Sequence, residues 1–558
     1  MSPEQRDQTL ITDLPQRVIG GKVSTIDRKG HWRVIEYELE KIGAGRALVG
    51  SQPGFERDPT TGPLTIRLGA RGHHRISFVT RYGPVRAKLT GEKCFSVCEP
   101  INEGLPKLPT AGSVEGWFDA EEVLWRQADL TGRDLIIDDR DPGTILLAIR
   151  LTPVEPADDA AEVRWPSAFE GGVTLGERMY RSPDELFEWF ERVPNDSCAK
   201  LALWECVAGD SCMYFTKVGT QFGDPAMTEF TGDPVREHDV IFTANMQQYH
   251  EWGVDPLNAM VEYAHGRGWE LYVYIRYRNY HDVWSNRFGA SRFYLEHPEY
   301  HLAGPDGEHV MGLSVAYDQV CRHLCELYVE MANYGIDGIC LGFNRGVPVV
   351  LYEQAMVKGF MSEYGQDPRK LPQRDPRWLD YTANVVTHFM RQVKDALGTK
   401  CRLSALVWGT EELNRRYGLD TAAWVADGIV DDLFTVSARY CKWCIHPAGT
   451  SEDLDFEYFQ NLPGRQNVRL WPTLYMWQPF AADPVGQAGF LQECLDAGAD
   501  GYAFWDAPMH SPDLQANVWD LGKMPRPAYR KTNRLLGKYE MINWDGYRWN
   551  RFSPVASW

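Results

Sequence analysis

Short apolar runs separated by glycine and proline dominate roughly the first 165 residues. Examples are RVIEYELE, HRISFVTRY and ILLAIRLTPV, which are rich in β-branched and aromatic residues. Runs of this length, with turn residues between them, favour antiparallel strands. Several in succession are typical of a β-sandwich or jelly roll. We therefore expect an accessory β-sandwich domain over residues 1–165.

The pattern changes after LTPVEPADDAAEVRWPSAFEGG, a stretch rich in proline and acidic residues that we interpret as a linker. Beyond it, segments with a helical period alternate with short apolar runs, as where VDPLNAMVEYAHGRG precedes ELYVYIRY. This alternation predicts a parallel sheet covered by helices, and its length suits a (β/α)₈ barrel. The predicted fold class is therefore α/β, with a TIM barrel as the candidate catalytic domain over residues 170–558.

Seven barrel strands are predicted with a clear apolar pattern. They are AKLALWEC, ELYVYIRY, DGICLGFN, RLSALVWG, DDLFTVSA, VRLWPTLYMW and DGYAFWDA. The eighth strand is left open between DVIFTAN and a run within the long loops.

Acidic residues at the predicted strand ends are the first candidates for chemistry, because active sites of such barrels lie at the C-terminal ends of the strands. Glu205 lies in an otherwise apolar strand, where a carboxylate is costly unless it is paired or used. Arg276 is its expected counter-charge. Asp506 ends the last strand, where the alternative is a hydrogen-bonded cap of the following loop. Glu353 is a further candidate, whereas Glu411 and Glu412 are better explained as the first turn of a helix.

Aromatic and polar residues gather at the same strand ends. The chain has 20 Trp, 26 Tyr and 23 Phe, and aromatic rings stack on the C–H faces of sugars while polar groups hold the hydroxyls. Burial of tryptophan in a large core is the alternative explanation. The candidate substrate-binding residues are Arg276, Asn344, Arg345, Trp408, Trp471, Tyr475 and Trp505. Arg276 would also suit a sugar that carries a carboxylate.

Charge excludes several classes of partner. The net charge of −19 argues against nucleic acid and anionic membranes, which need clustered Lys and Arg, and no apolar run of about 18 residues predicts a membrane span. The N-terminus lacks the pattern of a signal peptide. Twelve cysteines without a dense framework are then expected to be reduced thiols, which predicts a cytoplasmic protein. The acidic surface leaves a homo-oligomer open.

One motif suggests a metal. CKWCIH contains Cys441, Cys444 and His446, but a single C-x-x-C is only half of a zinc site and no second pair follows. A reversible disulfide between Cys441 and Cys444 is a second option. Neither a phosphate-binding loop nor a G-x-S-x-G motif is present. We expect no metal and no cofactor.

Three stretches resemble the glycoside-hydrolase-like (β/α)₈ barrels, especially the bacterial glycosyl hydrolase-like 10 group among glycosidases of the clan A type. They are SRFYLEHPEYHLAGPDGEHVMGLSVAY, YGIDGICLGFNRG and GADGYAFWD, and the resemblance covers about residues 195–510. It implies the barrel fold and, less specifically, carbohydrate metabolism. Barrels of this kind often carry an acid in the D-G-I-x-L-(D)-F strand, where this chain has Gly342.

The resulting hypothesis is a glycosidase that hydrolyses an oligosaccharide, with Glu205 and Asp506 as the carboxyl pair. Gly342 supports a different class, a barrel that binds carbohydrate without catalysis. A lyase or isomerase that acts on a sugar acid with a Tyr or His base is the third alternative.

Overall fold

The computed structural model describes residues 8–505, except 27, 40–41, 51–59, 81–83, 99–119, 140–143, 156–165, 172–174, 177, 194–197, 228–230, 235, 278–288, 373, 437–453 and 476–490. The chain divides into two compact units. The first holds the residues up to Arg164 together with Glu188–Cys198, and the second holds Trp165–Phe187 and the described residues from Ala199 onward. Within the described residues, no helix is long and apolar enough to cross a membrane.

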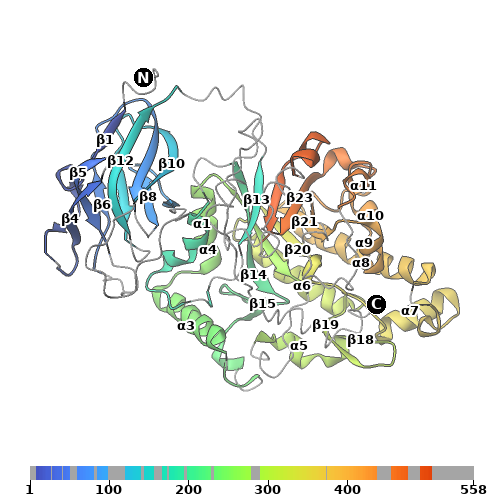
Figure 1. Ribbon diagram of the computed structural model, residues 1–558. Helices are drawn as coiled ribbons and strands as arrows, with labels where there is room; N and C mark the ends of the chain where they lie inside the picture. Colours follow the sequence, from blue (N-terminus) through green and yellow to red (C-terminus); the bar gives the residue numbers. More distant parts are fainter. Residues whose placement is uncertain are drawn as a thin grey trace, which may run out of the picture. The chain divides into compact units, whose positions relative to one another are not determined.

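Two mainly antiparallel sheets form the first unit (Figure 1). One has the order β10-β7-β12-β5-β4-β3, with β1 paired to β12, and the other has the order β2-β6-β11-β8-β9. Ile76 and Phe78 of one sheet and Leu135 and Ile137 of the other belong to a single buried cluster. These residues alternate along their strands, as expected where one face of a sheet packs on a core. The sheets therefore share one core, and a jelly-roll topology stays a prediction.

The strands of this unit have the following bounds: β1 (Thr9–Ile11), β2 (Val18–Gly20), β3 (Val23–Ser24), β4 (Trp32–Leu39), β5 (Gly43–Val49), β6 (Leu64–Ile66), β7 (His73–Thr80), β8 (Val85–Leu89), β9 (Ser96–Cys98), β10 (Glu121–Asp129), β11 (Leu135–Asp138) and β12 (Ile145–Pro153).

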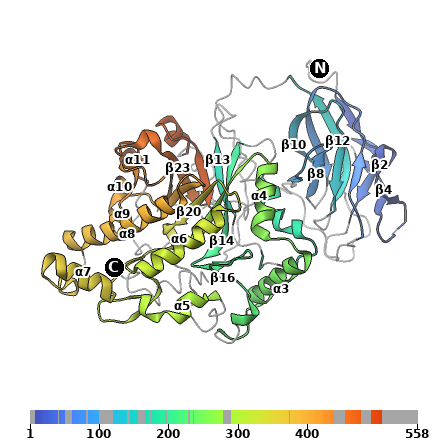
Figure 2. The ribbon, with the colours of Figure 1, turned by 180° about the vertical axis from the view of Figure 1, so that it is seen from behind.

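The second unit is a closed barrel of eight parallel strands, which confirms the predicted (β/α)₈ fold. The strands are β13 (Ser167–Gly171), β14 (Ala199–Ala208), β17 (Glu270–Arg276), β20 (Gly338–Gly342), β21 (Arg402–Trp408), β22 (Asp432–Val436), β23 (Arg469–Tyr475) and β24 (Tyr502–Trp505). The barrel closes because β13 pairs with both β14 and β24, with Ser167 opposite Tyr502. Figures 1 and 2 show β13 beside the late strands of the chain.

The eighth strand lies in neither of the places where it was expected. It is β13, whose sequence SAFEG belongs to the end of the stretch interpreted as a linker. DVIFTAN instead forms part of the helix α3 (Glu237–Trp252), in which Phe242, Asn245, Met246 and Tyr249 are buried. Their spacing has the helical period, so that packing of one helix face overrides the local β propensity of the short run.

Helices that alternate with the strands surround the barrel (Figures 1 and 2). The longer ones are α4 (Pro256–Gly266), α6 (Asp318–Ala332), α7 (Gln354–Tyr364) and α8 (Pro376–Leu397). In α8, the Asp375 side chain accepts a hydrogen bond from Arg377 N, Pro376 is the first residue and Gly398 is the C-cap. These are standard start and stop signals for a helix.

Glycines make room for aromatic rings inside the barrel. A Cβ on Gly338 would lie 2.6 Å from two ring carbons of Tyr272, and a Cβ on Gly501 would lie 2.5 Å from Cζ3 of Trp471. The interior is thus packed by large and small side chains that fit one another across neighbouring strands, as is usual for such barrels.

Candidate active site

A charged cluster fills the N-terminal end of the barrel interior. Asp432, the fully buried first residue of β22, accepts hydrogen bonds from Tyr272 Oη at 2.8 Å, Arg402 Nε at 2.9 Å and Trp471 Nε1 at 3.0 Å, and also pairs with Arg469. Because β17 and β22 are not neighbours in the sheet, the bond from Tyr272 crosses the interior. These four donors use all the acceptor positions of the Asp432 carboxylate. We therefore interpret the cluster of Asp432, Tyr272, Arg402, Arg469 and Trp471 as structural, and call it the plug.

The opposite, C-terminal end contains the predicted pair of Glu205 and Arg276. Side chains alternate along a strand, so Arg276 lies on the same interior face of β17 as Tyr272. Its Nε lies 2.7 Å from Glu205 Oε2, and Glu205 is only 1% exposed. The predicted counter-charge is therefore in place. A guanidinium at this distance favours the ionised carboxylate.

Tyr274 lies between these two levels. It is opposite Glu205 in the register of β14 and β17, and its hydroxyl donates to Asn344 Oδ1 at 3.0 Å. A Cβ on Gly342 would lie less than 3.0 Å from Cζ, Cε2 and Oη of Tyr274. The ring of Tyr274 therefore occupies the space of a side chain at position 342. Gly342 has a steric reason of its own, independent of any lost acid.

Two buried donors at this end have no partner among the described residues. They are Nδ2 of Asn344 and Nε1 of Trp408, and both residues are at most 2% exposed. Trp408 is the last residue of β21, and its main chain is held by the side chain of Asn414, with Asn414 Nδ2 donating to Trp408 O at 2.8 Å. Unpaired buried donors are costly and mark positions where a ligand or water can bind.

The other predicted binding residues fall into three groups. Trp505 ends β24 and is buried, in register with Tyr475 of β23. Trp471 lies lower, in the plug, where it donates to Asp432 and stacks on Phe434. For Tyr475 and Arg345 only the backbone is described, in β23 and in the short helix η7 (Phe343–Arg345). Asp506 lies outside the described residues.

The remaining acids have structural explanations. Glu411 and Glu412 begin α9 (Glu411–Arg416), and Glu412 pairs with Arg416 at 3.1 Å, which agrees with the helix-terminus explanation. Glu353 is 2% exposed, and its carboxylate accepts hydrogen bonds from Leu351 N at 2.9 Å and from the Ser314 hydroxyl. Burial raises the pKa of Glu353 to about 7, against the opposing effect of the Ser314 hydrogen bond.

No group of three or more potential metal ligands occurs among the described residues. Cys441 and Cys444, on which a metal was considered, lie outside them. Cys321 and Cys325 are one turn apart on α6, and burial raises the pKa of both thiols.

Tyr274 is the residue of this site that sequence reasoning missed. The alternation in ELYVYIRY was the available signal, because it places Glu270, Tyr272, Tyr274 and Arg276 on one face of the strand. Which face points inward becomes evident only when Tyr272 is seen to bond Asp432 across the barrel.

No protein-family model and no curated protein matches this sequence. Among solved structures, the chain is similar to a GH26-CBM35 β-(1,4)-mannanase from Podospora anserina, with 10% identity, coverage of 90% of this chain and 97% of the mannanase, and a TM-score of 0.28. An α-galactosidase from Thermus thermophilus shares 11% identity over 88% of this chain and 95% of its own, with a TM-score of 0.35. A histamine dehydrogenase from Rhizobium sp. 4-9 shares 12% identity over 47% of this chain and 36% of its own, with a TM-score of 0.26.

TM-scores this low say nothing about reaction or substrate. The fold is established by the closed strand pairing of the chain itself. What the strand pairing shows is that the second unit of this chain is a (β/α)₈ barrel.

Proposed function

We propose that this protein hydrolyses a glycosidic bond in an oligosaccharide at the C-terminal end of its barrel. The observation that carries the proposal is the ion pair between the buried Glu205, near the C-terminal end of β14, and the partly buried Arg276, the last residue of β17. A charged pair is expensive to bury, and this one lies at the end of the barrel where catalytic residues of such folds occur.

The pairing suggests a role for each carboxyl group. Because Arg276 favours the ionised form of Glu205, we assign Glu205 as the nucleophile or general base. Hydrolysis then needs a second carboxyl group that enters the reaction protonated and gives its proton to the leaving oxygen. We assign this role to Asp506, which follows Trp505 directly in the sequence.

The neighbouring groups can orient a sugar. Nδ2 of Asn344 and Nε1 of Trp408 are donors that sugar hydroxyl oxygens can satisfy. Stacking of a sugar on Trp408 or Trp505 stays a prediction, because both indoles are buried in this structure. Arg345 and Tyr475 follow or end neighbouring strands. Trp471 fits packing better than stacking because its indole is held by Asp432.

An acidic sugar is a narrower version of the proposal. A substrate carboxylate would have to share Arg276 with Glu205, which lies 2.7 Å from its Nε. The comparison of kcat/KM on neutral and uronate-containing oligosaccharides separates the two cases.

The test uses Glu205→Gln and Asp506→Asn, with Glu412→Gln as the control because Glu412 is also a strand-end acid but is exposed on α9. Each of the first two should lower kcat on a defined glycoside by at least about 100-fold, and the control should not. Intact hydrolysis in either variant would contradict the assignment. Glycan binding without any turnover by the wild type would favour a non-catalytic barrel, and release of an unsaturated uronate would favour a lyase.

A further inference from the structure

A pocket separate from the candidate active site lies outside the barrel interior. It has a volume of about 770 Å³ and is lined by five parts of the chain: the loop between β15 (Ser211–Cys212) and β16 (Thr220–Gln221), β16 together with residues 223–225 after it, α3, α5 (Arg292–Glu296) and α6. The residues that matter below are Gln247, His250, Arg292, Phe293 and His323. None of them belongs to the candidate active site.

His323 is held rigidly at this pocket. Its Nε2 lies 2.7 Å from Asp210 Oδ2, and Asp210 is fully buried. Phe293 stacks on the imidazole, with the ring centres 4.0 Å apart and an angle of 8° between the planes. Since the carboxylate can only accept, Nε2 of His323 carries the hydrogen of this bond. In the neutral ring, Nδ1 is therefore left as an acceptor.

His250 is held in the same way. Its Nε2 lies 2.9 Å from Gln221 Oε1, and its ring stacks on Phe215 at 3.9 Å and 6°. With Gln221 Oε1 as acceptor, Nδ1 of the neutral His250 ring is likewise an acceptor. Among the described residues, neither Nδ1 atom has a hydrogen-bond partner. Both histidines line the same pocket, and each has an Nδ1 atom that can accept a hydrogen bond from a ligand.

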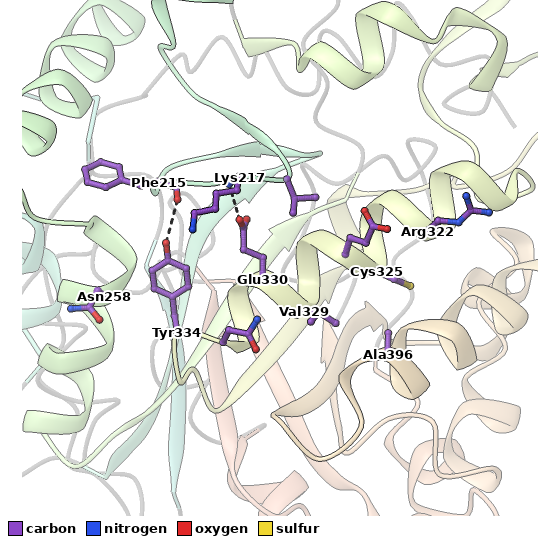
Figure 3. Close-up of a pocket in the computed structure, with 12 residues that line it drawn as sticks. Phe215, Lys217, Asn258, Arg322, Cys325, Val329, Glu330, Tyr334 and Ala396 are labelled. Carbon is purple, nitrogen blue, oxygen red and sulfur yellow. Dashed lines mark hydrogen bonds between the residues drawn. The ribbon is translucent and has the colours of Figure 1, made fainter.

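The loop between β15 and β16 is anchored from its other side (Figure 3). Glu330 of α6 accepts hydrogen bonds from Lys217 N at 2.7 Å, Thr216 Oγ1 at 2.6 Å and Tyr214 Oη at 2.9 Å. These bonds satisfy the carboxylate of Glu330, which is one of the two acids that line the neighbouring pocket of about 780 Å³ drawn in Figure 3. The same bonds fix the wall that the two pockets share.

The charges at the 770 Å³ pocket indicate the class of ligand. Its formally charged lining residues are Lys217, Arg292, Asp224 and Glu296, so that the positive and negative charges balance when the histidines are neutral. An anion would face both acids. A hydroxyl group both donates and accepts, so it can satisfy the imidazole acceptors and the amide donor of Gln247 together.

We propose that this pocket binds a neutral sugar unit and forms a second carbohydrate site of the protein. The proposal rests on the carbohydrate part of the proposed function but not on hydrolysis. A site of this kind would hold one part of a glycan while another part reacts, and would raise the effective concentration of chain ends at the barrel.

The probe is an array of neutral and uronate-containing oligosaccharides, followed by calorimetric titration of the best neutral ligand. The protein is the full chain carrying Glu205→Gln, so that the ligand is not consumed. Gln247→Ala and Arg292→Ala remove two exposed polar side chains that line the pocket. Gln248→Ala, on the next position of α3, and Arg322→Ala, on the next position to His323, are the controls because neither residue lines this pocket.

We expect Gln247→Ala and Arg292→Ala together to weaken binding at least tenfold, and the controls to leave it unchanged. Introduced without Glu205→Gln, the same pair should leave turnover of a small glycoside unchanged and raise KM on a long one. Glycan binding that is insensitive to the pocket variants would overturn the proposal, as would binding of uronate-containing glycans alone. Either result leaves the Glu205-dependent hydrolysis to be judged separately on the small glycoside.

Discussion

Replacement of Gly342 by alanine is the most direct test of how the barrel interior is built. The added methyl group would lie less than 3.0 Å from three atoms of the Tyr274 side chain, which is buried between strands and has no room to swing away. Overpacking of this kind costs about 1–3 kcal/mol. Displacement of the ring would also break the buried hydrogen bond from Tyr274 to Asn344, at a cost of about 1–3 kcal/mol.

The lower conformational entropy of the unfolded variant offsets part of these two costs. Gly342 has a φ of −81°, which alanine also adopts, so that the substitution restricts the unfolded chain and returns about 0.4–1 kcal/mol. The net loss should be about 1–5 kcal/mol in the free energy of unfolding. We would measure it by urea denaturation, following circular dichroism and tryptophan fluorescence together, because a chain with two units need not unfold in a single step.

Two backgrounds separate the steric cause from a general intolerance of the position. In Tyr274→Ala the ring is gone, and Gly342→Ala should become neutral or slightly stabilising. In Tyr274→Phe the ring carbons that cause the overlap remain, and the substitution should still be costly. Gly62→Ala is the control, since a Cβ there meets nothing within 4 Å. The reasoning is refuted if Gly342→Ala is tolerated within about 0.5 kcal/mol, or if it costs as much in Tyr274→Ala as in the wild type.

Three further outcomes follow from the contacts. Asp432→Asn should destabilise the barrel by about 3–5 kcal/mol in the same denaturation assay, because it leaves Arg402 and Arg469 without their buried charge partner; an unchanged midpoint would contradict the plug. Phe169→Ala should cost about 3–5 kcal/mol if β13 is a barrel strand, since Phe169 is fully buried against Trp269. The pKa of Glu353 is raised from its ordinary value of 4.5 to about 7 in the folded protein, because burial favours the protonated carboxyl group. The stability that the protonated Glu353 contributes is therefore present below pH 4.5 and lost as the pH rises to about 7. Glu353→Gln should therefore remove up to about 3 kcal/mol of that pH dependence, measured as unfolding free energy between pH 4.5 and 8.

The sequence was sufficient for the features that depend on local pattern. Seven barrel strands are apolar runs that follow helical segments, and each is a strand in the structure. The partnership of Glu205 with Arg276 followed from a buried acid in one strand and a base at the end of the next. Both inferences use a single strand or two successive ones, where neighbours in sequence are also neighbours in the sheet.

Features that depend on distant pairing could not be obtained in this way. SAFEG is short and directly follows an acidic, proline-rich stretch, and it is a barrel strand because β14 and β24 pair with it on either side. DVIFTAN has the composition of a strand, and only the helical spacing of the longer α3 segment corrects that prediction. The meaning of Gly342 depends on the ring of Tyr274, 68 positions earlier, which no local pattern connects to it.

The pairing of β13 with β24 has a consequence for how this protein is made. Ser167 and Tyr502 face each other across the closing seam, so that the first barrel strand leaves the ribosome long before its last partner exists. At about 5–20 residues per second, the delay is roughly 20 to 70 seconds. During that time one edge of β13 has unpaired backbone groups that can pair with another chain. Slow translation near the end of the barrel should therefore favour aggregation of the nascent protein, and chaperones that cover exposed strand edges should raise its yield.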